Sequence, residues 1–257
     1  MEELAEDLLR IKGDENETLL DIPTDKNLVK VDVLPSEFKG YPKGTAIYYK
    51  CIDLDEIETL NSGEPDLNRN MAYILNSIKC NTLKAEDLYY WDVIYIGVQR
   101  LLTALGGTTA KLPAVCPHCN TIVYKKFNYT DLNFKTLDIP ALPMKMEIGG
   151  KQIEFGLTTM KEFLSLPADG GEMAVYATYI KNLPEEEKLP FIKGLMGIDI
   201  KKIRFVDKQL DYGIVPFKVK CTNPKCKHEV SVEVTPFGVL FPEDEFGDDN
   251  EFEVQYG

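Results

Sequence analysis

Two short cysteine motifs are the clearest candidates for chemistry: residues 116–119 read CPHC and residues 221–226 read CTNPKC. Zinc prefers soft sulfur ligands, and a C-x2-C or C-x4-C turn lets two thiolates point at one ion. Two such pairs supply the four ligands of a tetrahedral structural site. The sequence therefore predicts one structural Zn2+ bound by Cys116, Cys119, Cys221 and Cys226.

Other interpretations of these cysteines stay open. The CPHC pair alone could be a redox dithiol, and the four thiols could be reduced core residues or form two disulfides. A catalytic zinc is disfavoured, because four sulfur ligands leave no coordination position for water or substrate. The two histidines, His118 and His228, lie close to the motifs and could replace a ligand, although we expect them outside the coordination shell. Lys220, Lys225 and Lys227 could offset the charge of four thiolates or simply be solvated.

The segments around the motifs indicate β-strands. Residues 121–125 follow the first motif, residues 215–220 precede the second, and residues 228–234 follow it. This order predicts a zinc ribbon. The residues between the two motifs are far more than a minimal ribbon needs, so they are expected to form an inserted subdomain.

The expected insertion has secondary-structure signals of its own. Apolar residues alternate on both sides of a Gly-Gly pair at 149–150, which predicts a hairpin over residues 144–157. Thr159 and Glu162 have the spacing of a capping box at a helix start. Further helices are expected around residues 173–180, 184–195 and 199–210.

Before the first motif, the pattern predicts strands followed by helices. Residues 29–34 and 46–51 alternate as strands, and apolar residues recur at helical spacing over residues 66–78 and 88–105. The single tryptophan, Trp91, is expected to anchor the core of this region.

Two charged residues lie on the second of these helices. Asp92 and Arg100 are two turns apart and therefore share roughly one face. They could brace neighbouring loops, or they could belong to a solvated face.

These patterns together predict an α+β protein, in which a helical N-terminal region is joined to a zinc ribbon with a long α/β insertion between its two cysteine knuckles. The expected divisions are an N-terminal amphipathic arm and linker (1–28), a strand-plus-helix region (29–110), the zinc-ribbon domain (111–242) with its insertion (126–213), and an acidic C-terminal tail (243–257). Leu4, Leu8 and Ile11 form the apolar stripe of the arm, which could dock on its own domain or on a neighbour.

Composition and charge argue against several classes of protein. The chain has 257 residues, of which 44% are hydrophobic, and this suffices for a core. Its formal net charge of -13 argues against broad binding to nucleic-acid phosphates, which depends on clustered Lys and Arg. The longest apolar run, residues 93–98, is too short to span a membrane. We see no secretion signal, and the thiols indicate a reducing cytoplasm. The two remaining cysteines, Cys51 and Cys80, have no partner at motif spacing and are expected to be ordinary buried thiols.

No common catalytic motif is visible. The sequence shows no nucleophile elbow, phosphate-binding loop, dinucleotide fingerprint or His-Glu-x-x-His. Acidic runs such as residues 185–187 usually form solvated helix N-termini. We therefore expect neither catalysis nor a small-molecule substrate.

Several features between residues 29 and 125 follow a recognisable order. They are Leu34-Pro35-Ser36, the turn at Lys39-Gly40-Tyr41, the acidic segment 53–60, Trp91-Asp92, Arg100, Gly106 and the CPHC motif. This order resembles that of the T4-type bacteriophage baseplate proteins, the family of baseplate hub subunits and hub-assembly proteins of contractile-tailed phages. The chain departs from the pattern at Val93, where a basic residue is expected, and at Leu101, where a second arginine is expected. A weaker similarity extends to residues 221–226 and 239–242.

The resemblance implies a virion or assembly component that is made in the host cytoplasm and binds other phage baseplate and tail proteins. In that case the zinc would lock the ribbon, and the arm and the tail would contact neighbours. The alternative is a zinc-ribbon adaptor in a transcription or nucleic-acid assembly, which a basic stripe on the ribbon would favour. An enzyme is the third possibility.

Overall fold

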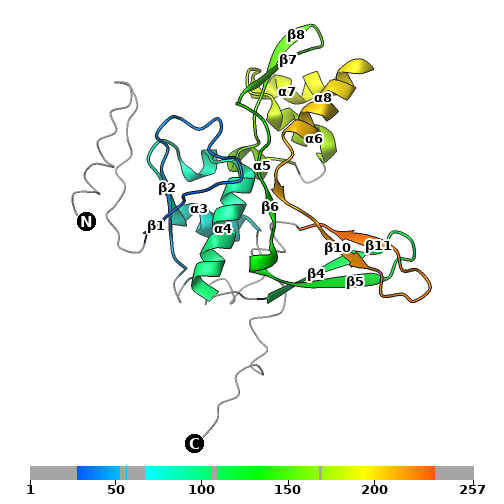
Figure 1. The fold of residues 1–257 in the computed structure, drawn as a ribbon. Coiled ribbons are helices and arrows are strands. Elements are labelled where there is room, and N and C mark those ends of the chain that lie inside the picture. Colours follow the sequence, from blue (N-terminus) through cyan, green and yellow to red (C-terminus); the bar gives the residue numbers. More distant parts are fainter. Residues whose placement is uncertain (1–27, 53–55, 57–66, 106–108, 168–169, 235–257) are drawn as a thin grey trace, which may run out of the picture.

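The computed structural model describes residues 28–52, 56, 67–105, 109–167 and 170–234 (Figure 1). The expected arm, most of the acidic segment 53–60, Gly106 and the acidic tail lie outside these residues. Helices and strands are mixed along the described chain, so the α+β prediction is confirmed. Within this part of the chain, none of the helices is both long enough and apolar enough to cross a membrane.

The N-terminal region combines a three-stranded antiparallel sheet with two helices. The strands are β1 (Leu28–Lys30), β2 (Ile47–Lys50) and β3 (Ile78–Cys80), in the order β1-β2-β3. The helices are α3 (Leu67–Ser77) and α4 (Tyr90–Leu105), with a short 3-10 helix at Ala85–Asp87 between them.

The prediction that the first helix continues through Ile78 is wrong. The helix α3 ends at Ser77, and Ile78 begins β3, where it pairs with Tyr49 of β2. Both environments bury an isoleucine equally well, so the apolar spacing cannot distinguish the last helical turn from the first strand residue.

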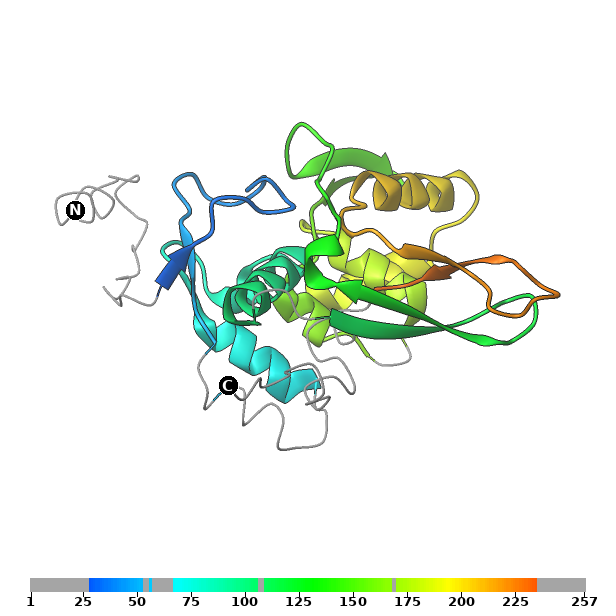
Figure 2. The same cartoon turned by 60° about the horizontal axis from the view of Figure 1, so that its bottom comes forward.

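Two antiparallel hairpins carry the cysteine motifs, and we call them the paired hairpins. One consists of β4 (Thr109–Val115) and β5 (Ile122–Asn128), and the other of β10 (Phe217–Lys220) and β11 (Glu229–Val232). Strand β11 contacts β4, and β10 contacts β5. Figures 1 and 2 show both hairpins extending side by side, away from the helices. The three strands predicted around the motifs are thus confirmed, with slightly different ends.

The segment between the cysteine motifs forms a hairpin and four helices. These are β7 (Met144–Ile148), β8 (Lys151–Phe155), α5 (Met160–Leu164), α6 (Gly171–Tyr179), α7 (Glu185–Lys193) and α8 (Ile198–Gln209). Gly149 and Gly150 make the predicted turn at φ angles of 58° and 74°, which favour glycine. Two short strands that pair with each other, β6 (Phe134–Lys135) and β9 (Gly213–Ile214), connect this segment to the hairpins, and a 3-10 helix occupies Tyr129–Asp131.

The described residues bury two large apolar clusters. The first lies under β1 to β5, α3 and α4, and the second fills the space between β7, β8 and the helices α6 to α8. Trp91 packs against both clusters, so its predicted role as a core anchor is confirmed and extended. The backbone of Gly213 packs directly against the indole ring of Trp91, so a Cβ at this position would lie 2.3 Å from the ring. The φ of Gly213, 106°, also favours glycine.

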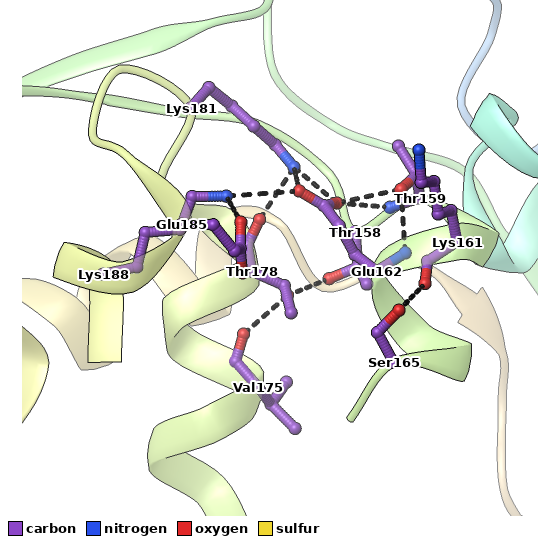
Figure 3. Close-up of polar contacts among 10 residues, drawn as sticks. All are labelled: Thr158, Thr159, Lys161, Glu162, Ser165, Val175, Thr178, Lys181, Glu185 and Lys188. Atoms are coloured by element: carbon purple, nitrogen blue, oxygen red, sulfur yellow. Dashed lines mark hydrogen bonds and ion pairs between the residues drawn. The ribbon is translucent and has the colours of Figure 1, made fainter. Parts of the chain in front are cut away.

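A network of charged groups joins the two clusters where α5 meets α6 and α7 (Figure 3). Thr159 and Glu162 form the predicted capping box at the start of α5. Lys181 donates hydrogen bonds to both carboxylate oxygens of Glu162, at 2.7 and 2.8 Å, and to the carbonyl oxygen of Thr178. The buried Lys188 of α7 lies 3.6 Å from the same carboxylate. Because Glu162 faces two cations, it ties α5 to the segment that follows it.

Asp92 lies inside the protein, with none of its surface exposed. It accepts hydrogen bonds from the Ser36 amide at 3.0 Å, from Ser36 Oγ at 2.5 Å and from the Tyr41 hydroxyl at 2.8 Å. Burial raises the pKa of Asp92 to about 6, although these hydrogen bonds oppose the shift. Asp92 therefore braces the turn after β1, and the solvated-face interpretation is wrong.

Arg100 is also buried, with 2% of its surface exposed. Its Nε donates to the carbonyl oxygen of Lys50 at 2.8 Å, and its Nη2 donates to both oxygens of Glu56 at 2.8 and 3.0 Å. The two charged residues of α4 thus fix two different loops to one helix.

Candidate metal centre

The first cysteine motif occupies the turn between β4 and β5. The Cys116 amide donates to the carbonyl oxygen of Thr121, and the Asn120 amide donates to the carbonyl oxygen of Cys116, both at 2.9 Å. Asn120 adopts a φ of 56°, which asparagine tolerates well. This tight turn brings the side chains of Cys116 and Cys119 to the same side of the hairpin tip.

The second motif forms a similar turn between β10 and β11. The Cys221 amide donates to the carbonyl oxygen of His228 at 2.8 Å, and the Cys226 amide donates to that of Asn223 at 3.0 Å. The side-chain oxygen of Asn223 accepts a hydrogen bond from the Lys225 amide. Asn223 therefore organises the turn in both its backbone and its side chain, a common role of asparagine in turns.

The two turns meet, and their four sulfur atoms converge. All four Sγ atoms lie within 4.8 Å of one another. Cys116 Sγ is 3.7 Å from Cys226 Sγ, and Cys119 Sγ is 3.5 Å from Cys221 Sγ. A tetrahedral zinc with Zn–S bonds of about 2.3 Å would place its sulfurs about 3.8 Å apart. The cluster could therefore hold a metal ion with little adjustment.

The four cysteines lie in a partly buried, apolar environment. All four cysteines are free thiols, and Cys116 and Cys221 are buried while Cys119 and Cys226 are half-buried. The small apolar cluster around them contains Val123 of β5 and Val230 of β11. Partly buried thiolates need a counter-charge, and a divalent cation is the usual one.

The pKa values of Cys119 and Cys221 are shifted in opposite directions. The hydrogen bonds that Cys119 shares with the side chain and the backbone of Thr121 lower the pKa of Cys119 to about 6. For Cys221, the hydrogen bond with the Asn223 backbone lowers the pKa. Burial and the contacts with Cys119 and Cys116 raise it by more, so the pKa of Cys221 is about 12. The role of Thr121, which lies two residues after the CPHC motif, was not predicted from the sequence.

The histidines take no part in the four-cysteine group. Instead, the rings of His118 and His228 stack, with centroids 4.3 Å apart and planes 18° apart. The stacked pair lies at the hairpin tips and joins the two turns. The other two cysteines, Cys51 and Cys80, lie in the N-terminal region, and only Cys80 is fully buried.

The paired hairpins carry an unusual charge for an acidic protein. Residues 109–128 and 217–232 contain one acidic residue, Glu229, and seven lysines: Lys111, Lys125, Lys126, Lys218, Lys220, Lys225 and Lys227. The three lysines considered above as counter-charges for the thiolates are all exposed: Lys220, Lys225 and Lys227.

Comparison with known proteins supports the resemblance seen in the sequence. No curated protein and no solved structure matches the chain. The family model described as T4 bacteriophage base plate protein matches residues 59–241, which is well over half of the chain and includes both cysteine motifs and the segment between them. The chain therefore belongs to the T4 bacteriophage base plate protein family.

Proposed function

We propose that the protein is a structural or assembly component of the phage tail baseplate, at its hub, and that it works by binding other baseplate and tail proteins. The observation that carries this proposal is the family match over residues 59–241. The more specific assignment to the hub rests on the order of motifs between residues 29 and 125. The protein would be made in the host cytoplasm and, if retained, would reside in the virion tail.

We further propose that the four cysteines bind a structural zinc and that the paired hairpins form a zinc ribbon. Convergence of the sulfurs within 4.8 Å supports this assignment. Four thiolates at near-tetrahedral spacing suit Zn2+, and they would fill its coordination sphere. Such a site favours a structural role and supports the proposal that the protein is not an enzyme.

A zinc at this position would connect the two ends of a long segment. Residues 120–220 leave the first hairpin and return to the second, so the ion would close this loop at its base. Structural zinc sites contribute about 10–16 kcal/mol of apparent binding free energy, which becomes folding free energy. The separate apolar cluster formed between Leu137 and Tyr212 supports the proposed division into ribbon and insertion. Strand β5, however, continues to Asn128, beyond the expected start of the insertion at residue 126.

The lysines of the paired hairpins favour a second candidate function, an adaptor in a nucleic-acid assembly. The paired hairpins carry seven lysines against one glutamate, an excess of positive charge that this alternative would require. Their charge could neutralise phosphates. Family membership and the net charge of the whole chain favour the baseplate role.

Complementation of a phage that lacks the gene would test the proposal. We expect such a phage to make incomplete baseplates or tails, visible by electron microscopy, and the wild-type protein to restore them. The Cys221→Ser/Cys226→Ser variant should fail to restore assembly, whereas Cys51→Ser, which alters a cysteine outside the cluster, should succeed. Normal tails and infectivity without the gene would contradict the proposal. Co-purification from infected cells, followed by mass spectrometry, would identify the neighbours.

A further inference from the structure

The outer face of the β4–β5 hairpin is exposed and chemically distinctive. Residues 111, 113 and 115 of β4 alternate on one face, and their direct partners on β5 are residues 126, 124 and 122. All six side chains are exposed: Lys111, Pro113, Val115, Ile122, Tyr124 and Lys126. We call this set the outer hairpin face.

The centre of this face is apolar. Val115 is 59% exposed, Ile122 is 54% exposed and Tyr124 is 55% exposed. Large apolar side chains that cluster on a surface usually mark an interaction site. A β-hairpin buries one face against the core, and here that inner face contributes Leu112 and Phe127 to the first apolar cluster. The outer hairpin face has no such cover among the described residues.

Two lysines flank the apolar centre at the end remote from the cysteines. Lys111 and Lys126 are direct cross-strand partners, and the Lys111 ammonium lies 4.4 Å from the centroid of the Tyr124 ring. Within the described part of the chain, neither lysine forms an ion pair with a carboxylate. They also lie about 17 Å along the strand from Cys116, too far to balance the thiolates. A ligand for this face should therefore combine carboxylates with apolar side chains.

The chain itself contains a segment of this chemistry. Residues 243–257 hold seven acidic residues, no lysine or arginine, and the aromatic residues Phe246, Phe252 and Tyr256. The described chain reaches Val234, which packs in the same apolar cluster as Leu112 of β4. From Val234, the stretch to Phe246 can extend to about 40 Å, whereas β4 is about 24 Å long. The segment can thus reach every part of the outer hairpin face.

We propose that the acidic tail, residues 243–257, docks in cis on the outer hairpin face, with its carboxylates beside Lys111 and Lys126 and its aromatic side chains on Val115, Ile122 and Tyr124. Attachment to the same chain gives the tail an effective concentration on the order of 1 mM, so weak intrinsic affinity suffices. Nucleic acid fits the face less well, because Val115 and Ile122 offer neither charge for phosphates nor rings for base stacking. This inference does not depend on the baseplate role.

Carbodiimide cross-linking of the full-length protein tests the proposal, because it joins a carboxylate directly to an adjacent amine with loss of water. We expect mass spectrometry to find the tail carboxylates linked mainly to Lys111 and Lys126, and not to the lysines of α8. A mixture of 14N- and 15N-labelled protein should give links within one isotope only. Mixed-isotope links in the majority would place the tail on a second copy and overturn docking in cis.

A second set of variants leaves Lys111 and Lys126 unchanged. These variants test whether the cross-links reflect docking of the tail or chance encounters. Val115→Ser/Ile122→Ser and, in the tail, Phe246→Ser/Phe252→Ser should each reduce the links at least threefold. Val33→Ser, which changes another strongly exposed side chain (62% exposed), should leave them unchanged. Circular dichroism and metal content should confirm that all variants fold. Links that persist unchanged in the apolar variants would overturn the proposal, as would tight binding of single-stranded DNA to this face with no tail links.

Discussion

Cys119 Sγ lies 3.5 Å from Cys221 Sγ, although 102 positions separate the two residues in the chain. This contact joins the tips of the paired hairpins, at the end of β5 and β10 that is remote from the inserted segment. A metal ion there would do more than stabilise two turns, because it would also hold together the two hairpins from which the insertion leaves and to which it returns.

We predict one zinc ion per protein chain. Elemental analysis of protein purified under reducing, chelator-free conditions should find it, and the Cys221→Ser/Cys226→Ser variant should have lost it, because two thiolates hold zinc far more weakly than four. Cys51→Ser should retain a full equivalent. His118→Ala should retain it too, since the stacked histidines lie outside the four-cysteine group. Purified protein with almost no metal, or zinc retained by the double cysteine variant, would refute the site.

Replacing Asp92 by alanine should destabilise the protein by about 3 kcal/mol. The change would leave the Ser36 amide, the Ser36 hydroxyl and the Tyr41 hydroxyl without their acceptor in a buried site, at about 1–3 kcal/mol each, partly offset by removal of a buried charge. Urea unfolding would measure the difference. Asp211→Ala, which removes an exposed ion pair with Lys135, should cost less than about 0.5 kcal/mol and serves as the control. Equal losses for the two variants would count against the buried network.

The Asp92 carboxyl should titrate near pH 6, because burial raises its pKa to about 6 in the folded protein. The unfolded value is about 3.9, so the folded state binds this proton more tightly. The resulting contribution favours folding below about pH 4 and is lost as the pH rises through about 6, a change of about 3 kcal/mol. Carbon NMR of the carboxyl would give the pKa directly. The stability difference between the wild-type protein and Asp92→Asn should shift against the wild type over this range, and a flat difference would disprove the assignment.

Glu162→Ala should destabilise the junction between the two apolar clusters by about 2 to 3 kcal/mol. It would leave the partly buried Lys181 without its carboxylate partner and would remove the capping box with Thr159, whereas Lys188 would keep its ion pair with Glu185. Hydrogen exchange should show the largest increase in α5 and in the segment between α6 and α7. The control is Glu154→Ala, whose partner Lys145 is exposed, and for which we expect a loss below about 1 kcal/mol. Exchange that rises equally in both variants would exclude a bracing role for Glu162.

Features that depend on near neighbours could be predicted from the sequence. The Gly149-Gly150 turn, the capping box of Thr159 and Glu162 and the two cysteine motifs each follow from residues a few positions apart, so their spacing predicts their structure. Local spacing could not predict that Ile78 belongs to a strand, that Asp92 is buried, or that Lys111, Tyr124 and Lys126 share one exposed face. Each of these outcomes depends on which distant segment packs against the residue. Apolar periodicity predicts that a residue is buried, but the segment that covers it is determined by long-range packing.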